Sequence, residues 1–197
     1  MANTDKPMGM KPISHINGSP WNGMFRMYYK AAGLSEAIFV GSPVKSAGSA
    51  DSTGKYPTIQ LAGTDPIRGV VIGFAKTPYG VFDATDLDLK YSPSDTAHYV
   101  AVVDDPSVIF EMQEDSSTAL TVTEIGLNAS PTTESGSTTT GLSSVEIDCS
   151  TENTTSTLSL KILRLLDRED NELGDYAKFE VLINSHELGQ GLGSTGV

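Results

Sequence analysis

Two segments near the C-terminal end of the chain constrain its fold most, because each alternates polar and apolar residues with a period of two. A period of two is typical of a strand with one buried face. The expected buried faces are Leu158, Leu160 and Ile162 in the first segment, and Phe179, Val181 and Ile183 in the second. The sequence therefore predicts two amphipathic strands, at 157–162 and 178–184.

The residues between these strands indicate how they are joined. Asp167–Asp175 is highly charged and rich in turn-forming residues, so we expect an antiparallel pair with a long solvated connection. A short helix at 164–170 is the alternative, because Leu163, Leu165 and Leu166 interrupt the alternation.

The composition favours strands along the whole chain. The 197 residues include 19 glycines and 10 prolines, and only 38% of the residues are hydrophobic. Short apolar runs recur at intervals of roughly 8–15 residues between polar loops. We therefore expect an all-β fold, a jelly-roll-like sandwich or barrel with an extended N-terminal arm and long polar loops.

Local patterns give more detailed expectations. His98–Val103 and Val108–Met112 read as a hairpin closed by the turn Asp104–Ser107. The polar stretches 46–57 and 129–140 read as loops, the second of them exposed because it is rich in Ser and Thr. The expected organisation is an arm at 1–24, a single β-domain at 25–188 and a flexible Gly-rich tail at 189–197.

The arm contains prolines and two Asn-Gly turn dipeptides, followed by a group of aromatic residues. These aromatic side chains could anchor the arm on its own core, or they could dock on a neighbouring subunit. The candidate partner-binding residues are Pro12, Trp21, Phe25, Tyr28 and Tyr29.

Charge and cysteine content argue against several classes of protein. The formal net charge of −12 disfavours nucleic-acid binding, because the chain would be repelled by phosphates. Cys149 is the single cysteine, so no internal disulfide and no cysteine-based metal site can form. The apolar runs are too short for a membrane span, and the N-terminus lacks a signal-peptide pattern.

The motifs do not indicate catalysis. Gly191–Gly196 matches GxGxxG, but the chain ends one residue later, so no helix can follow the glycines. The carboxylates near the expected hairpin, Asp104, Asp105, Glu111, Glu114 and Asp115, lack a metal-binding spacing and are more simply solvated. We expect a protein that is not an enzyme and has no catalytic residue, cofactor or metal site.

Several segments, taken in order, resemble a known family. They are Lys11-Pro12, Asn17–Trp21, Val40–Val44, Ile67–Val70, Val102–Pro106, Phe110–Asp115, Leu163–Arg168 and Phe179–Leu188. Their layout resembles that of the head decoration (cement) proteins of tailed bacteriophages, which are encoded near the major capsid protein. The resemblance runs from Lys11 to Leu188 and rests on turns and strands.

The resemblance implies a jelly-roll-like virion protein, made in the host cytoplasm and bound as a homo-oligomer to the outer surface of an icosahedral capsid. Its implied partners are the major capsid protein and further copies of itself, and its implied role is to stabilise the capsid by bridging subunits. Deletion of residues 1–21 should then weaken capsid binding without unfolding the domain.

Two other functions remain open. One is a carbohydrate- or host-surface-binding β-module of a virion, using Tyr79 and Tyr91 in the loop 76–96. The other is a hydrolase that uses Asp104 or Glu111.

Overall fold

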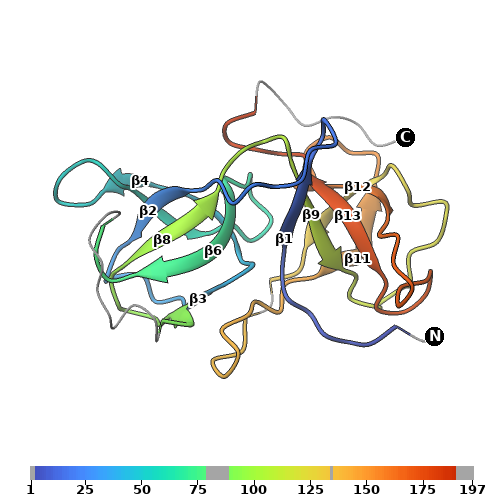
Figure 1. Ribbon diagram of the computed structural model, residues 1–197, viewed down its shortest axis with the longest axis horizontal. Coiled ribbons are helices and arrows are strands. Elements are labelled where there is room, and N and C mark those ends of the chain that lie inside the picture. Colours follow the sequence, from blue (N-terminus) through green and yellow to red (C-terminus); the bar gives the residue numbers. More distant parts are fainter. Residues whose placement is uncertain (1–2, 79–88, 134, 190–197) are drawn as a thin grey trace.

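The computed structural model describes residues 3–78, 89–133 and 135–189, and these residues form strands and loops only (Figure 1). The all-β fold expected from the sequence is confirmed. The strands are β1 (Lys11–His15), β2 (Arg26–Lys30), β3 (Ile38–Phe39), β4 (Pro43–Ala50), β5 (Pro57–Leu61), β6 (Gly69–Ala75), β7 (Tyr91–Ser92), β8 (His98–Val103), β9 (Val108–Gln113), β10 (Asn128–Pro131), β11 (Ile147–Asn153), β12 (Leu160–Leu165) and β13 (Lys178–Ile183).

The strands form two main bodies that lie side by side in Figure 1. We call the closed barrel β2-β5-β4-β6-β8 the barrel lobe, and the six-stranded sheet β1-β9-β13-β12-β10-β11 the sheet lobe. Strands β3 and β7 make a separate short pair. Every strand of the barrel lobe falls in the sequence between β1 and β9, which are antiparallel neighbours with Lys11 opposite Glu111. The barrel is thus inserted between two adjacent strands of the sheet.

The antiparallel pair predicted near the C-terminal end is confirmed as β12 and β13, but the first strand runs over 160–165 rather than 157–162, and Leu158, expected on its buried face, lies before it and is only partly buried. Leu160 lies opposite Ile183, and Leu165 lies opposite Phe179. The register shifts between Ile162 and Arg164. This irregularity explains why the apolar alternation fails after Ile162, so the short helix considered at 164–170 is not needed.

The hairpin expected at 98–112 is wrong. Strand β8 pairs with β2 and β6 in the barrel lobe, whereas β9 pairs with β1 and β13 in the sheet lobe. The intervening residues do turn, and the Asp105 carboxylate accepts hydrogen bonds of 2.8 Å from both the amide and the hydroxyl of Ser107. The local sequence correctly indicated a turn. A turn sequence does not show, however, whether the two strands that it connects pair with each other.

Two stretches expected as loops contain strands. Residues 46–50 extend β4, and Asn128–Pro131 forms β10, which lies between β12 and β11 and is buried throughout. Polar residues are tolerated there because they are hydrogen-bonded: the Asn128 amide group donates to the carbonyl of Thr155 at 3.0 Å, and the Ser130 amide donates to the Thr151 hydroxyl at 2.9 Å.

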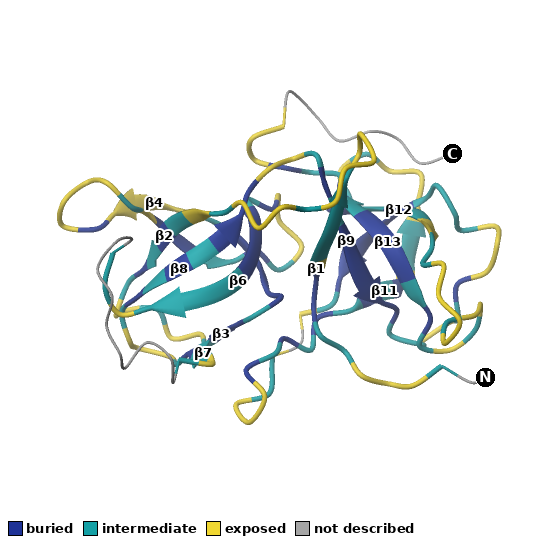
Figure 2. Ribbon diagram, viewed as in Figure 1, coloured by how far each residue is buried: buried dark blue, intermediate teal, exposed yellow. Residues whose placement is uncertain are grey.

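The apolar core of the sheet lobe continues into the barrel lobe. Phe110 and Phe179 of the sheet lobe belong to one buried cluster with Val70 and Val103 of the barrel strands (Figure 2). A second cluster, which includes Val44 and Val100, fills the barrel. The shared cluster joins the two lobes by apolar packing, in addition to the connections of the chain.

The segment expected as an extended N-terminal arm is also part of this packing. Its residues 11–15 form β1 at the edge of the sheet, and Met10 is only 1% exposed. Just before Met10, Gly9 crosses Gly41 so closely that a Cβ on Gly9 would lie 2.4 Å from the Gly41 carbonyl oxygen. The two glycines allow the backbones to touch there.

Candidate interaction surface

A surface cavity of about 380 Å³ opens where the two lobes and the C-terminal segment meet. Its lining residues are His15, Asn22, Met24, Phe25, Arg26, Asp104, Asp105, Pro106 and Leu188. They come from the end of β1, the connection into β2, the link between β8 and β9, and the segment after β13. Three parts of the chain that are distant in sequence, around residues 15–26, 104–106 and 188, therefore contribute to one surface.

The two Asn-Gly dipeptides set the course of the chain into this cavity. Gly18 and Gly23 both have a φ angle of +84°, a conformation that glycine adopts without steric strain. After the first turn the chain runs back along β1, since the His15 amide donates to the Ser19 carbonyl at 2.8 Å. At the second turn, the Asn22 side chain accepts a hydrogen bond from the Met24 amide at 3.2 Å. These turns place Met24 and Phe25 beside the link between the lobes.

Large apolar side chains are exposed around this cavity. Met24 is 68% exposed and Leu188 is 38% exposed, and both line the cavity. Ile16, which is 60% exposed, follows the lining residue His15. We call Ile16, Met24 and Leu188 the apolar patch. Exposed apolar groups gathered at one place are characteristic of surfaces that bind another molecule.

A hydrogen-bonded cluster lies beneath the cavity. The Asp104 carboxylate accepts from the Arg26 guanidinium at 2.9 Å and from the Tyr28 hydroxyl at 2.7 Å. Arg68 donates from Nε to the same hydroxyl at 2.9 Å. Burial, reinforced by the bond to Asp104, raises the pKa of Tyr28 to about 12. Tyr28 therefore stays neutral at ordinary pH and holds the carboxylate in place.

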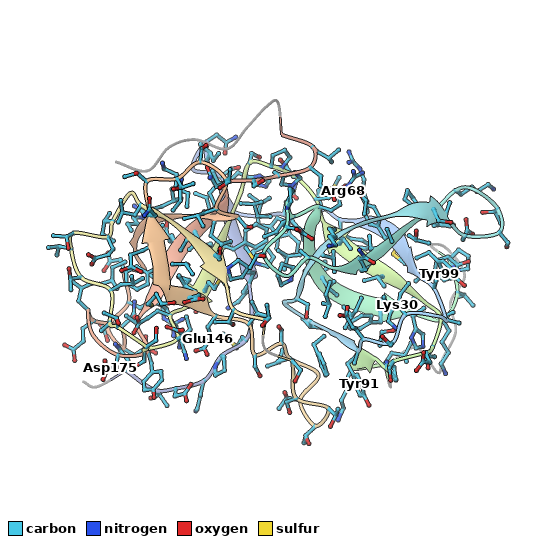
Figure 3. All side chains as sticks on the ribbon, turned by 180° about the vertical axis from the view of Figure 1, so that it is seen from behind. Lys30, Arg68, Tyr91, Tyr99, Glu146 and Asp175 are labelled. Atoms are coloured by element: carbon cyan, nitrogen blue, oxygen red, sulfur yellow. The ribbon has the colours of Figure 1, made fainter. Side chains whose placement is uncertain are left out.

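The cluster reaches the C-terminal segment through Arg68, whose position on the barrel lobe is marked in Figure 3. Its Nη1 lies 3.7 Å from the carboxylate of Glu187, which also accepts from the amide of Ser46 at 2.9 Å and from its hydroxyl at 2.5 Å. These contacts fix the segment that carries Leu188 against the barrel lobe.

The rim of the cavity is negative at Asp105. Partial burial alone would raise the pKa of the Asp105 carboxyl, but the hydrogen bonds from Ser107, helped by His15, together lower it. The His15 ring lies 3.6 Å from this carboxylate. An ionised carboxylate beside apolar side chains favours a partner that brings apolar groups next to a basic one.

Two of the predicted partner-binding residues lie at or beside the cavity. Phe25 is one of its lining residues. Trp21 is half-buried against the core of the sheet lobe, and its indole donates to the Met24 carbonyl at 3.3 Å. Trp21 therefore supports the loop that exposes Met24.

The other three predicted residues lie elsewhere. Pro12 is in β1 opposite Phe110. Tyr28 is only 2% exposed, so its side chain offers no surface to a partner. Tyr29 lies opposite Tyr99 in the barrel lobe, with their ring centroids 5.3 Å apart. The structure thus separates a group of residues that is compact in the sequence.

Sequence reasoning missed Met24 and Leu188. An isolated apolar residue in a loop belongs to no periodic pattern, so its exposure is not evident from the sequence. The available signal for Met24 was its position directly after an Asn-Gly turn, where side chains are often exposed.

The carboxylates once considered for catalysis have separate structural partners. Glu111 lies 3.0 Å from the guanidinium of Arg168, Glu114 accepts from the Cys149 thiol at 2.9 Å, and Asp115 accepts from the amide of Ser117 at 3.0 Å. Over residues 3–78, 89–133 and 135–189, no group of three His, Cys, Asp or Glu residues could hold a metal ion. Tyr79 and the glycines of 191–196 lie outside the described residues.

No family model matches the chain, and searches of the curated proteins and of the solved structures return no significant match. The part of the chain that the structure describes contains no helix of the length and apolar character needed to cross a membrane. The structure therefore defines an all-β protein of two joined lobes with an apolar patch at their junction.

Proposed function

We propose that this protein is a structural component of a tailed-phage virion that binds the outside of the icosahedral capsid and stabilises it by bridging major capsid subunits. The observation that carries the proposal furthest is the apolar patch, in which the exposed side chains of Met24 and Leu188 line one cavity and the exposed Ile16 directly follows the lining residue His15. The order of segments from Lys11 to Leu188, which resembles that of phage decoration proteins, is the reason for proposing the major capsid protein as the partner.

The charge of the chain also supports an outer position. With a net charge of −12, the protein suits a surface away from packaged DNA better than a surface that lines it. The protein would act by occupying two capsid subunits at once, since both contacts must then break before the subunits separate. In turn, binding to the capsid stabilises the folded protein, because the unfolded chain does not bind.

The test is co-sedimentation of the purified protein with phage heads that lack this component. We expect saturable binding at a fixed ratio to the major capsid protein. Met24→Asp should weaken it by roughly 30-fold, the effect of losing about 2 kcal/mol at an interface hot spot.

Val122→Asp is the matched control, because Val122 is 70% exposed and is not among the residues that line the cavity. Equal loss of binding in both variants would show that added charge, rather than the apolar patch, is responsible. Absence of saturable binding by the unaltered protein would refute the proposal.

Deletion of residues 1–21, the test suggested by the sequence, is no longer suitable. It would remove β1 and the buried side chain of Met10, so it would damage the fold as well as the surface. Single substitutions in the exposed loop avoid this problem.

A second candidate is a glycan-binding module, favoured by a tyrosine cluster on the barrel lobe. The Tyr99 ring lies 5.3 Å from that of Tyr29 and 5.1 Å from that of Tyr56, and all three side chains are partly exposed (Tyr99 is labelled in Figure 3). Aromatic faces combined with hydroxyl groups can pack on the C–H face of a sugar and bond to its hydroxyls.

Binding to a glycan panel distinguishes this candidate. Loss of a glycan signal in Tyr99→Ala, with retention in Tyr91→Ala, would support it. Tyr91, which the sequence suggested for sugar binding, is a suitable comparison because its ring lies outside this cluster and stacks on Phe39, with ring centroids 5.1 Å apart. A panel with no signal for the unaltered protein would remove this candidate.

A further inference from the structure

The N-terminal residues 3–10 form a strap along the sheet lobe, which runs from the N-terminal end toward β1 in Figure 1. Its first contact is Asn3, whose side-chain amide donates to the Glu172 carbonyl at 2.8 Å and to the Asp175 carbonyl at 3.0 Å. Its last is the buried pair of residues Gly9 and Met10, where the Met10 amide donates to the Gly41 carbonyl, just before β4, at 2.9 Å. Residues 4–6, between these contacts, are exposed.

The middle of the strap is hydrogen-bonded to Gln113, at the end of β9. Its amide group donates to the Asp5 carboxylate at 3.0 Å and to the Glu146 carboxylate at 2.7 Å. Its carbonyl accepts from the Lys6 backbone amide at 3.0 Å. Two carboxyl groups are therefore brought to the same amide group, one from the strap and one from the sheet lobe.

The backbone of Glu146 is held in the sheet lobe by hydrogen bonds to Thr132. Its backbone amide donates to the Thr132 hydroxyl at 2.9 Å, and its carbonyl accepts from the Thr132 amide at 2.8 Å. In the described part of the chain, no salt bridge involves Glu146. Its negative charge is thus not neutralised by a paired cation there.

The charged groups that raise the pKa of Glu146 are all acidic. They are Asp5 from the strap, and Glu114 and Asp115 from the segment after β9. Glu114 and Asp115 are fixed by hydrogen bonds within the sheet lobe, to Cys149 and Ser117 respectively. Asp5 is the member of this group that lies on an exposed terminal segment, so it can leave when the repulsion increases.

We propose that residues 3–6 act as a proton-operated latch: they stay docked on Gln113 while the Glu146 carboxyl is protonated, and they are released when it ionises. Protonation keeps the carbonyl oxygen of Glu146 as an acceptor for Gln113 but removes the charge that repels Asp5. The buried Gly9 and Met10 limit the released segment to the residues before them, so β1 remains paired. This latch does not depend on the proposed capsid function.

The working range of the latch is near neutral pH. The pKa of Glu146 is raised from 4.5 to about 7, mainly by burial and further by the neighbouring carboxylates. If release of the strap restored the ordinary pKa of Glu146, the docking equilibrium would weaken by up to about tenfold between pH 6 and pH 8, and it would change little above pH 8. Docking weakens as pH rises because the docked state binds the proton more tightly.

Amide hydrogen exchange on the full-length protein tests the latch, with rates corrected for the intrinsic effect of pH. We expect the peptide that covers residues 3–8 to lose protection by up to about tenfold between pH 6 and pH 8. Peptides from β13 should keep theirs, which separates release of the strap from general unfolding. Unchanged protection of the strap across this range would overturn the proposal.

Substitutions identify the group responsible. Glu146→Gln keeps an acceptor for Gln113 without the charge, so protection of the strap should become independent of pH. Asp5→Asn should also reduce the pH dependence, because it removes the charge that Glu146 repels. Asp5 is exposed, so this variant tests the latch even if Glu146→Gln folds poorly. Glu36→Gln, the same change at an exposed carboxylate in the connection between β2 and β3, should behave as the unaltered protein. Persistence of the full pH response in both Glu146→Gln and Asp5→Asn would refute the latch.

Discussion

The Tyr28 hydroxyl donates a 2.7 Å hydrogen bond to the Asp104 carboxylate, and this bond joins β2 to the residue that follows β8. Both side chains are almost fully buried, with exposed fractions of 2% and 5%. Asp104 begins the link between the two lobes, so the bond holds the point at which the chain leaves the barrel.

Tyr28→Phe should therefore destabilise the protein by about 1–3 kcal/mol, because the buried Asp104 carboxylate loses a donor and Arg68 loses an acceptor. Tyr29→Phe is the control, since the neighbouring ring is partly exposed and is held by ring contacts. Urea denaturation of the two variants measures the difference. Equal free energies of unfolding would contradict the structural role given to the Tyr28 hydroxyl.

The crossing of Gly9 and Gly41 leads to a second prediction. Gly9→Ala should lose about 1–3 kcal/mol more stability than Gly48→Ala, as expected for a side chain forced into a packed site. Both glycines have positive φ angles, +67° and +78°, but a Cβ on Gly48 would meet nothing within 4 Å. Comparison of the two variants by thermal unfolding thus separates steric contact from backbone strain, and similar losses would show that the contact can relax.

The single cysteine should be unreactive in the folded protein. Burial raises the pKa of the Cys149 thiol, and the neighbouring Glu114 carboxylate raises it further. A disulfide reagent at pH 8 should label native Cys149 at least about a thousandfold more slowly than the denatured chain, because labelling requires opening of the core. A cysteine placed on the exposed hairpin by Ser52→Cys provides the fast reference, and rapid labelling of native Cys149 would be inconsistent with its burial.

His186 should make the protein less stable in acid. Burial lowers its pKa from 6.5, and Arg68 adds to this effect, while Asp104, Glu187 and Asp105 oppose it. The unfolded chain then binds a proton that the folded chain does not, so the stability contribution present above about pH 6.5 is lost as pH falls below it.

The free energy of unfolding of His186→Asn should consequently fall less than that of the unaltered protein between pH 7 and pH 5.5. The Leu188 amide donates to Nδ1 of His186 at 2.9 Å, and the side-chain oxygen of asparagine retains an acceptor for this amide. Comparison of the two proteins isolates His186 from other groups that titrate in this range. Parallel pH profiles would mean that His186 does not cause the acid sensitivity.

The sequence predicted those parts of the fold that depend on local alternation. The faces of β12 and β13 follow from a period of two, and Phe179, Val181 and Ile183 are buried as expected. The sequence did not reveal that β8 and β9 belong to different sheets, because strand pairing depends on contacts between residues distant in the chain.

The candidate surface was predictable only in part. Phe25 was expected from the aromatic character of its segment, but Leu188 joins it through the folding of a segment more than a hundred residues away. Tyr28 shows the opposite case, since an aromatic residue with a polar hydroxyl can serve equally well inside a barrel when partners are present.

The insertion of the barrel between β1 and β9 has a consequence for synthesis of the chain. When Lys11–His15 leaves the ribosome, its pairing partner at Val108–Gln113 does not yet exist. The barrel strands lie in between and can close first, so β1 must wait unpaired until they are complete. Such long-range pairing slows folding, and a strand that waits unpaired can associate with other chains. The sheet lobe can therefore be completed only after the whole barrel sequence has been synthesised.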